Sequence, residues 1–165
     1  MSNAPDPLID PEHAAFMSGA VSIGVGSCDA DLLPDLTRAF GCRVSIDRRR
    51  VTVFVSAEQS RDVLADLRAN GTVAVVFTQP ATHRTVQFKG SDAAVEPLAD
   101  GDLARIERYR EAFVAHLVAL GYSALAIRTM VDCPPHELTA IAFTPSAAFS
   151  QTPGPQAGTP LHSPR

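Results

Sequence analysis

Apolar and polar residues alternate along several short segments of the chain, a pattern typical of β-strands with one buried face. In the segment 85–89, for example, Val86 and Phe88 face one way, and the polar residues between them face the other. The strands predicted in this way are 21–25, 40–46, 51–55, 73–77, 85–89, 93–96 and 138–143. The first of them alternates Val and Ile with Ser and Gly, so one of its faces carries only small residues.

Helical spacing is found in fewer places. Residues 56–70 carry an apolar stripe, with Ser56 and Gln59 as a capping box at the start and Gly71 as a left-handed stop. Residues 102–120 are the longest expected helix, and 12–17 a short one. Residues 123–131 fit either a second short helix or an irregular segment. The apolar stripe of the longest helix is Leu103, Ile106, Phe113, Leu117 and Leu120.

Many short strands and few helices predict a mainly β (α+β) protein, and favour an antiparallel barrel over a parallel sheet. At 165 residues we expect one domain. Residues 1–11 contain three prolines and are expected to be a flexible arm, 12–150 the folded domain, and 151–165 a Pro- and Gly-rich tail.

Composition narrows the function classes. A net charge of -4 without a basic face or tail argues against nucleic-acid binding. No apolar run approaches the ~20 residues that a membrane span needs. Three cysteines without a CxxC pair fit a reduced, cytoplasmic setting. Cys133 and His136 lack a second pair of ligands, so no metal site is expected.

Polar and basic residues lie beside the predicted strands where they could hold a phosphate and a flat ring. Ser60 and Arg61 fall in the first turns of the helix 56–70, whose positive end favours an anion. Arg38 precedes the strand 40–46. Thr85, Gln87 and Lys89 share one strand face. The alternatives are a surface Arg61 paired with Asp62 or Asp66, and a merely solvated strand face.

The segment TVAVVFTQPATHRTVQFKG, after a helix ending in RANG, resembles the central block of the pyridoxamine 5'-phosphate oxidase-like FMN-binding split-barrel proteins. The stretch from VSIGVGS to VTVFVS resembles their first three strands, and QTPGPQAG resembles a tail found in one branch. The resemblance covers residues 16–158. It implies an antiparallel split β-barrel with flanking helices, and a homodimer with FMN at the subunit interface.

The same resemblance implies roles for individual residues. Arg38 and Arg61 match the basic residues that hold the phosphate. Thr85 matches a side chain at the flavin edge; because Thr is shorter than the usual amide, Gln87 could replace it. Phe54 and Val55 match the strand whose backbone lines the ring. Lys89 would meet the phosphate or the partner subunit, and the tail would pack near the cofactor or the dimer seam.

These residues predict an FMN-dependent oxidoreductase that is cytoplasmic, homodimeric and active on an unidentified small molecule with an unidentified electron donor. True pyridoxamine 5'-phosphate oxidase activity is not expected, because the end AFSQTPGPQAGTPLHSPR differs from that enzyme's substrate-binding segment. Alternatives are F420 in place of FMN, a non-enzymatic flavin carrier or sensor, a cofactor-free dimer, or a haem protein with an axial ligand from His83, His116 or His136.

Overall fold

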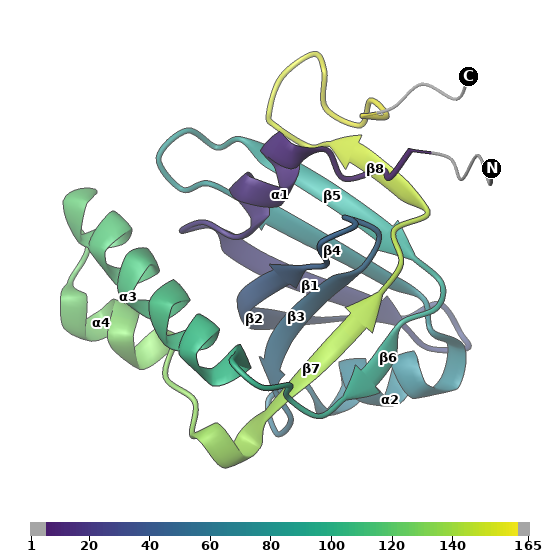
Figure 1. Ribbon diagram of the computed structural model, residues 1–165, viewed down its shortest axis with the longest axis horizontal. Coiled ribbons are helices and arrows are strands. Elements are labelled where there is room, and N and C mark those ends of the chain that lie inside the picture. The colour runs from purple at the N-terminus through teal and green to yellow at the C-terminus, as the bar shows by residue number, and fades with distance from the viewer. Residues whose placement is uncertain (1–5, 162–165) are drawn as a thin grey trace.

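One strongly curved antiparallel sheet forms the centre of the protein (Figure 1). The computed structural model describes residues 6–161. The helices in this range are α1 (Pro11–Met17), α2 (Arg61–Asn70), α3 (Asp102–Ala119), α4 (Ala124–Met130) and the 3-10 helix η1 (Pro135–Glu137). The strands are β1 (Ser22–Cys28), β2 (Pro34–Val44), β3 (Val51–Ser56), β4 (Val73–Thr78), β5 (Thr85–Gly90), β6 (Ala94–Glu96), β7 (Leu138–Phe143) and β8 (Ala147–Ser150).

The strands are ordered β6-β7-β3-β2-β1-β4-β5-β8, and every neighbouring pair is antiparallel. The sheet curls without closing, so β6 and β8 are its edges. A β-bulge between Ala39 and Cys42 bends the long strand β2, as bulges do where a sheet curves. This arrangement confirms the mainly β, antiparallel split barrel with flanking helices.

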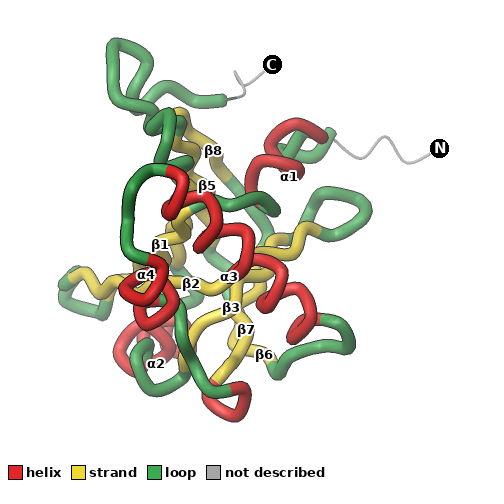
Figure 2. Tube along the Cα trace, turned by 90° about the vertical axis from the view of Figure 1, so that its left-hand side faces the viewer, coloured by secondary structure: helices red, strands yellow, loops and turns green. Residues whose placement is uncertain are grey.

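Alternation along the strands builds the core. Ile23 and Val25 of β1 are buried on the inner face, together with Val53 of β3, Val75 of β4 and Phe88 of β5. Every residue of β3 is buried. Helix α3 packs on the neighbouring strand β2, and the segment after α4 reaches the end of β3, where Ser56 Oγ donates to Glu137 Oε2 at 3.4 Å. In Figure 2, α3 crosses the strands β2 and β3.

Two polar contacts fix α3 on the sheet. At its start the carboxylate of Asp102 accepts from Arg43 Nε at 3.0 Å. Seven residues on, the Tyr109 hydroxyl donates to the Val21 carbonyl at 2.8 Å. Residues 124–130 are helical, which settles the alternative that the sequence left open. Leu103 and Leu120 are 47% and 44% exposed, so the expected apolar stripe was wrong at both ends.

The start of α2 also differs from the prediction. The Gln59 N–H does donate to Ser56 Oγ at 3.2 Å, but residues 57–60 form a turn, and α2 begins only at Arg61. Ser60 is the N-cap residue. The contact of Ser56 with Gln59 therefore stabilises the turn and not the helix. Arg61 is the first residue of α2 and does not lie one turn into it.

Both ends of the chain are more ordered than composition indicated. Residues 1–5 of the expected arm lie outside the described range, but Ile9 is fully buried and its carbonyl accepts from Arg48 Nε. At the other end, strand β8 was missed. The tail folds back on β8 through bonds from the Gly158 N–H to the Ser150 carbonyl and from the Leu161 N–H to the Ala148 carbonyl.

Candidate functional site

Four neighbouring strands, β2, β1, β4 and β5, present one continuous surface on the side of the sheet opposite the core. We call it the outer face. It carries side chains or glycines that are direct cross-strand neighbours: Gly24 faces Arg38 and Val76, and Val76 faces Gln87. The next row contains Leu36, Gly26, Ala74 and Lys89. Leu36 is 79% exposed, and the glycines are partly exposed. The surface is therefore open to a ligand or partner.

Gly24 and Gly26 give the outer face a flat floor. Neither has a positive φ angle. A Cβ built on Gly24 would meet its nearest neighbour, Leu36 Cδ1, at 3.9 Å, and one on Gly26 would meet the Ala74 carbonyl oxygen at 3.7 Å. Since these are ordinary contact distances, the fold itself does not require glycine at either position. Glycine in a strand often marks a bulge, a tight bend or a place where a ligand or another backbone approaches closely.

Arg38 lies within β2, not ahead of a strand as expected, because β2 begins at Pro34. Its Nη1 donates to Ser22 Oγ at 3.2 Å, and no acidic partner is found for it in residues 6–161. Pairing with β3 stops at Ala39, so residues 34–38 of β2 have a strand neighbour on one side only. Arg38 thus stands where the sheet opens.

The start of α2 fills the gap beside this free stretch of β2. Ser60 is 1% exposed, and its hydroxyl lies 2.7 Å from Thr37 Oγ1. Arg61 is exposed and has no ion pair or side-chain hydrogen bond within the described part of the chain, so the pairing with Asp62 or Asp66 is not formed. The contact places the start of α2 beside β2, but Thr37, the neighbour of Val25, and Arg38, the neighbour of Gly24, lie on opposite faces of the strand.

Strand β5 places Thr85, Gln87 and Lys89 on the face that their alternation predicted. Thr85 is only 8% exposed, and its hydroxyl contacts Thr78 Oγ1 at 3.1 Å and donates to the His83 carbonyl at 2.9 Å. Gln87 is half-buried and more accessible. Of the two polar side chains considered for a ring edge, Gln87 is therefore the better placed.

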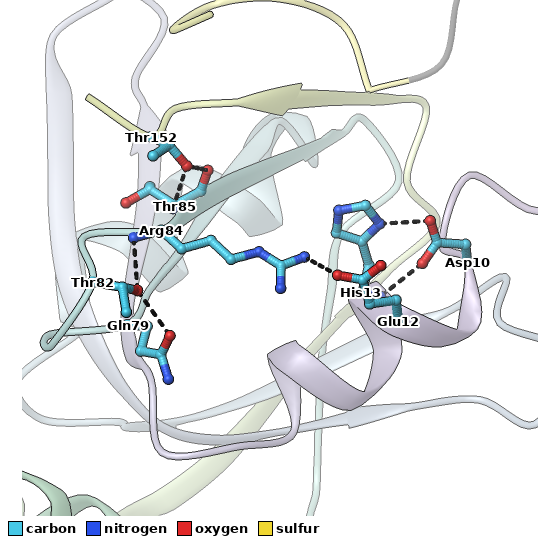
Figure 3. A network of polar contacts seen from close by, with 8 residues as sticks. All are labelled: Asp10, Glu12, His13, Gln79, Thr82, Arg84, Thr85 and Thr152. Carbon is cyan, nitrogen blue, oxygen red and sulfur yellow. Dashed lines mark hydrogen bonds and ion pairs between the residues drawn. The ribbon is translucent and has the colours of Figure 1, made fainter. Parts of the chain in front are cut away.

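The tail packs against the same strand. The Thr85 N–H donates to Thr152 Oγ1 at 2.9 Å (Figure 3). Gln151 Nε2 donates to Gln87 Oε1 at 3.3 Å, and the Lys89 ammonium lies 5.4 Å from the Phe149 ring centroid. Leu36 is a residue of this surface that the sequence analysis missed, whereas Gln151 begins the tail QTPGPQAG that was expected near the cofactor or the dimer seam. The short apolar run 147–149 was the available signal for β8.

Phe54 and Val55 do not contribute side chains to the outer face. Both are fully buried. Val55 pairs with Ala39 and Thr139, and the Phe54 ring would lie 3.4 Å from a Cβ on Gly41, near Tyr109. The resemblance implied only that the backbone of Phe54 and Val55 lines the ring, and this backbone pairs with β7.

Carboxylates lie close to the start of α2, and their negative charge disfavours the binding of an anion there. Asp66 accepts from Ser27 Oγ at 2.7 Å. Desolvation, together with the charges of Asp66 and Asp62, raises the pKa of Asp35 above its usual 3.8. A pocket of about 580 Å³ opens beside these groups. Its lining includes Cys28, Asp35, Leu36, Ala74, Lys89 and Ser146.

None of the histidines in residues 6–161 belongs to the strands that form the outer face. Those in the described range are His13 on α1, His83 in the β4–β5 turn, His116 on α3 and His136 on η1. His13 contacts Asp10, and Arg84 of the same turn bonds Glu12 on α1, which ties α1 to the turn (Figure 3). Within residues 6–161 no three His, Cys, Asp or Glu side chains are grouped to hold a metal, and no helix has the length and hydropathy to cross a bilayer.

No protein-family model and no curated protein sequence matches the chain. Solved structures do. HupZ of Group A Streptococcus is 16% identical, with a TM-score of 0.55 over 91% of this chain and 99% of that one. A proposed pyridoxamine 5'-phosphate oxidase from Lactobacillus delbrueckii is 13% identical, with a TM-score of 0.53 over 86% of this chain and 93% of that one. An F420 reductase is 11% identical, with a TM-score of 0.52 over 85% of this chain and 98% of that one. The chain therefore has the split β-barrel fold of the pyridoxamine 5'-phosphate oxidase-like proteins.

Proposed function

We propose that the protein is an FMN-binding flavoprotein with oxidoreductase activity, and that it works as a homodimer. The observation that carries the proposal is the glycine floor of the outer face. Gly24 and Gly26 are not required by the fold, and polar side chains of β2 and β5 surround them. A planar ring needs such a floor, and a side chain at either position would lift the ring from the strand.

The residues around the floor fit the groups of FMN. Arg38 and Arg61 supply guanidinium donors for the phosphate, and the N-terminal turn of α2 adds a positive helix end. Gln87 offers amide atoms for the edge of the ring, and Gln151 holds that amide in place. The cofactor would supply the electron-transfer chemistry, and the protein would bind and orient it. Lys89 remains available for the phosphate or for the partner subunit.

Two features of the outer face favour a dimer. Leu36 is exposed at one end of a row that continues with Gly26 and Ala74, and the glycine floor is open on the side away from the core. Covering it with a second copy would bury Leu36 and enclose the ring between subunits. Among the eight residues predicted for the cofactor, Ser60 and Thr85 have hydroxyls already engaged within the chain, so we assign them positioning roles.

F420 is the second candidate, because it is also a flat tricyclic ring bearing a phosphate and because an F420 reductase shares the fold. Haem is less favoured, since none of the histidines in residues 6–161 lies on the outer face. The test is to incubate the purified protein separately with FMN, F420 and haemin, remove free ligand, and record the visible spectrum. Retained flavin bands near one equivalent per chain are expected. Retention of haemin but not FMN would contradict the proposal.

A further inference from the structure

A second pocket lies away from the glycine floor, between the first half of α3 and the segment that follows α1. Its volume is about 260 Å³. Figure 1 shows the chain after α1 running toward α3 before it turns into β1. The residues that line it include Ser18, Gly19, Cys42, Arg105, Arg108 and Tyr109.

The pocket holds two cations and no acidic side chain. Arg105 is partly buried, and its Nε is fully buried without a hydrogen-bond partner. Arg108 is exposed and forms no ion pair within residues 6–161. The buried carboxylate of Asp102, also on α3, does not neutralise them, because it already binds Arg43 and the Ala99 N–H. A buried donor without a partner costs free energy, and more so when it belongs to a charged group.

The other side chains of the pocket cannot offset this charge. Cys42 is 4% exposed, and burial raises the pKa of its thiol to about 12, so it stays neutral at physiological pH. Burial likewise raises the pKa of Tyr109, whose hydroxyl is engaged with the Val21 carbonyl. The positive charge of the two arginines is therefore uncompensated.

We propose that this pocket binds a phosphate group, either as inorganic phosphate or as the phosphate of a small monoester. A guanidinium binds phosphate oxygens through paired N–H groups, and here one such donor is preformed, desolvated and unused. The pocket is larger than phosphate alone and leaves room for a small organic group. This site is independent of the flavin proposal, because its arginines come from α3 and not from β2 or α2.

Binding is measured as the phosphate-dependent rise in Tm relative to chloride at equal ionic strength, and by calorimetric titration with inorganic phosphate and with glycerol phosphate. A ligand that binds only the native state raises Tm with concentration. The variants are Arg105→Met and Arg108→Met, with Arg68→Met as the matched control on α2, where the arginine is also exposed. Arg38→Ala tests whether phosphate binds at the outer face instead.

We expect phosphate, unlike chloride, to raise the Tm of the parent. Arg105→Met should bind phosphate at least tenfold more weakly and melt no lower without it, because an unpaired buried donor is removed. Arg108→Met should weaken binding several-fold and Arg68→Met should not. Tighter binding of glycerol phosphate than of phosphate would identify the monoester as the ligand. The proposal is overturned if phosphate and chloride act alike, if Arg105→Met binds as the parent does, or if Arg38→Ala alone abolishes binding.

Discussion

The hydroxyl of Thr37 lies 2.7 Å from the hydroxyl of Ser60, and this contact joins the free end of β2 to the start of α2. It occurs where β3 has ended, so no strand separates the two elements. Because Arg38 and Arg61 are the next residues along the chain, the contact brings the backbones of two basic residues near each other although they are far apart in the sequence.

Arg61→Ala should weaken FMN binding without weakening the fold. Arg61 is exposed at the first position of α2, and most surface substitutions change stability little. Loss of a charge-assisted hydrogen bond should cost ~1.5–3 kcal/mol of FMN binding. Leu64→Ala should do the opposite: Leu64 is 2% exposed, and the cavity should cost ~2–5 kcal/mol of unfolding free energy. Fluorescence titration and thermal melts separate the two effects. Unchanged FMN affinity in Arg61→Ala would remove this helix start from the site.

Gly24→Val should stabilise the cofactor-free protein and impair its binding of FMN. A Cβ meets nothing closer than 3.9 Å at this position, and valine suits a strand better than glycine does. The gain should be roughly 0.5–1 kcal/mol of unfolding free energy. A branched side chain on the floor should nevertheless keep a flat ring away from the strand. Urea unfolding of the free protein, followed by FMN titration, tests both parts, and a variant that binds FMN normally would rule out the glycine floor as the ring site.

Asp35→Asn should raise stability at neutral pH. Since the pKa of Asp35 is raised in the folded protein, the native state binds more protons than the unfolded state as the pH rises above about 3.8, and stability falls through that window. Above that window the carboxylate is ionised in both states, and the full penalty of its charge is present. Removing the charge should relieve repulsion from Asp66 and Asp62.

The stability of parent and Asp35→Asn should therefore differ at pH 7 and converge as the pH falls below the unfolded value. Melts across this pH range give the comparison. A difference that grows toward acid pH would mean that Asp35 is stabilised, not repelled, by its surroundings.

Leu36→Glu should separate the subunits of the proposed dimer without unfolding them. Leu36 is 79% exposed on the outer face, so a charge there costs little in the free chain but opposes burial against a partner. Leu125→Glu is the matched control, because Leu125 is 76% exposed on α4. By light scattering, the parent and the control should have near twice the 17.5 kDa chain mass, and Leu36→Glu near the chain mass. A dimer that survives Leu36→Glu would place the interface elsewhere.

The local alternation of apolar and polar residues was sufficient to predict most strands, because most of them bury one face against the same core. The alternation in 21–25 also predicted the small-residue face of β1. It could not show that Arg38 is the neighbour of Gly24, because register is set by pairing between distant segments. The Thr37–Ser60 contact could not be predicted for the same reason, because it joins two segments that are distant in the sequence.

In two places the structure differs from what the local sequence indicated. The proline- and glycine-rich tail lacks any apolar period, yet its backbone bonds to β8 hold it beside Gln87. Ser56 has the expected capping contact, but the turn over 57–60 uses it, and the helix begins later. In both cases hydrogen bonds between backbone groups hold the segment in place, and these bonds cannot be predicted from composition.

The most direct measurement is a parallel titration of the parent protein with FMN and with riboflavin, which differ only in the phosphate, repeated with Arg38→Ala. The account predicts FMN binding at least tenfold tighter than riboflavin in the parent, since one lost charge-assisted bond is worth ~1.5–3 kcal/mol and 1.4 kcal/mol is about tenfold. Arg38→Ala should narrow that difference while leaving riboflavin affinity unchanged. Equal affinities in the parent, or a preference for FMN that Arg38→Ala leaves intact, would contradict a flavin phosphate site at the end of β2.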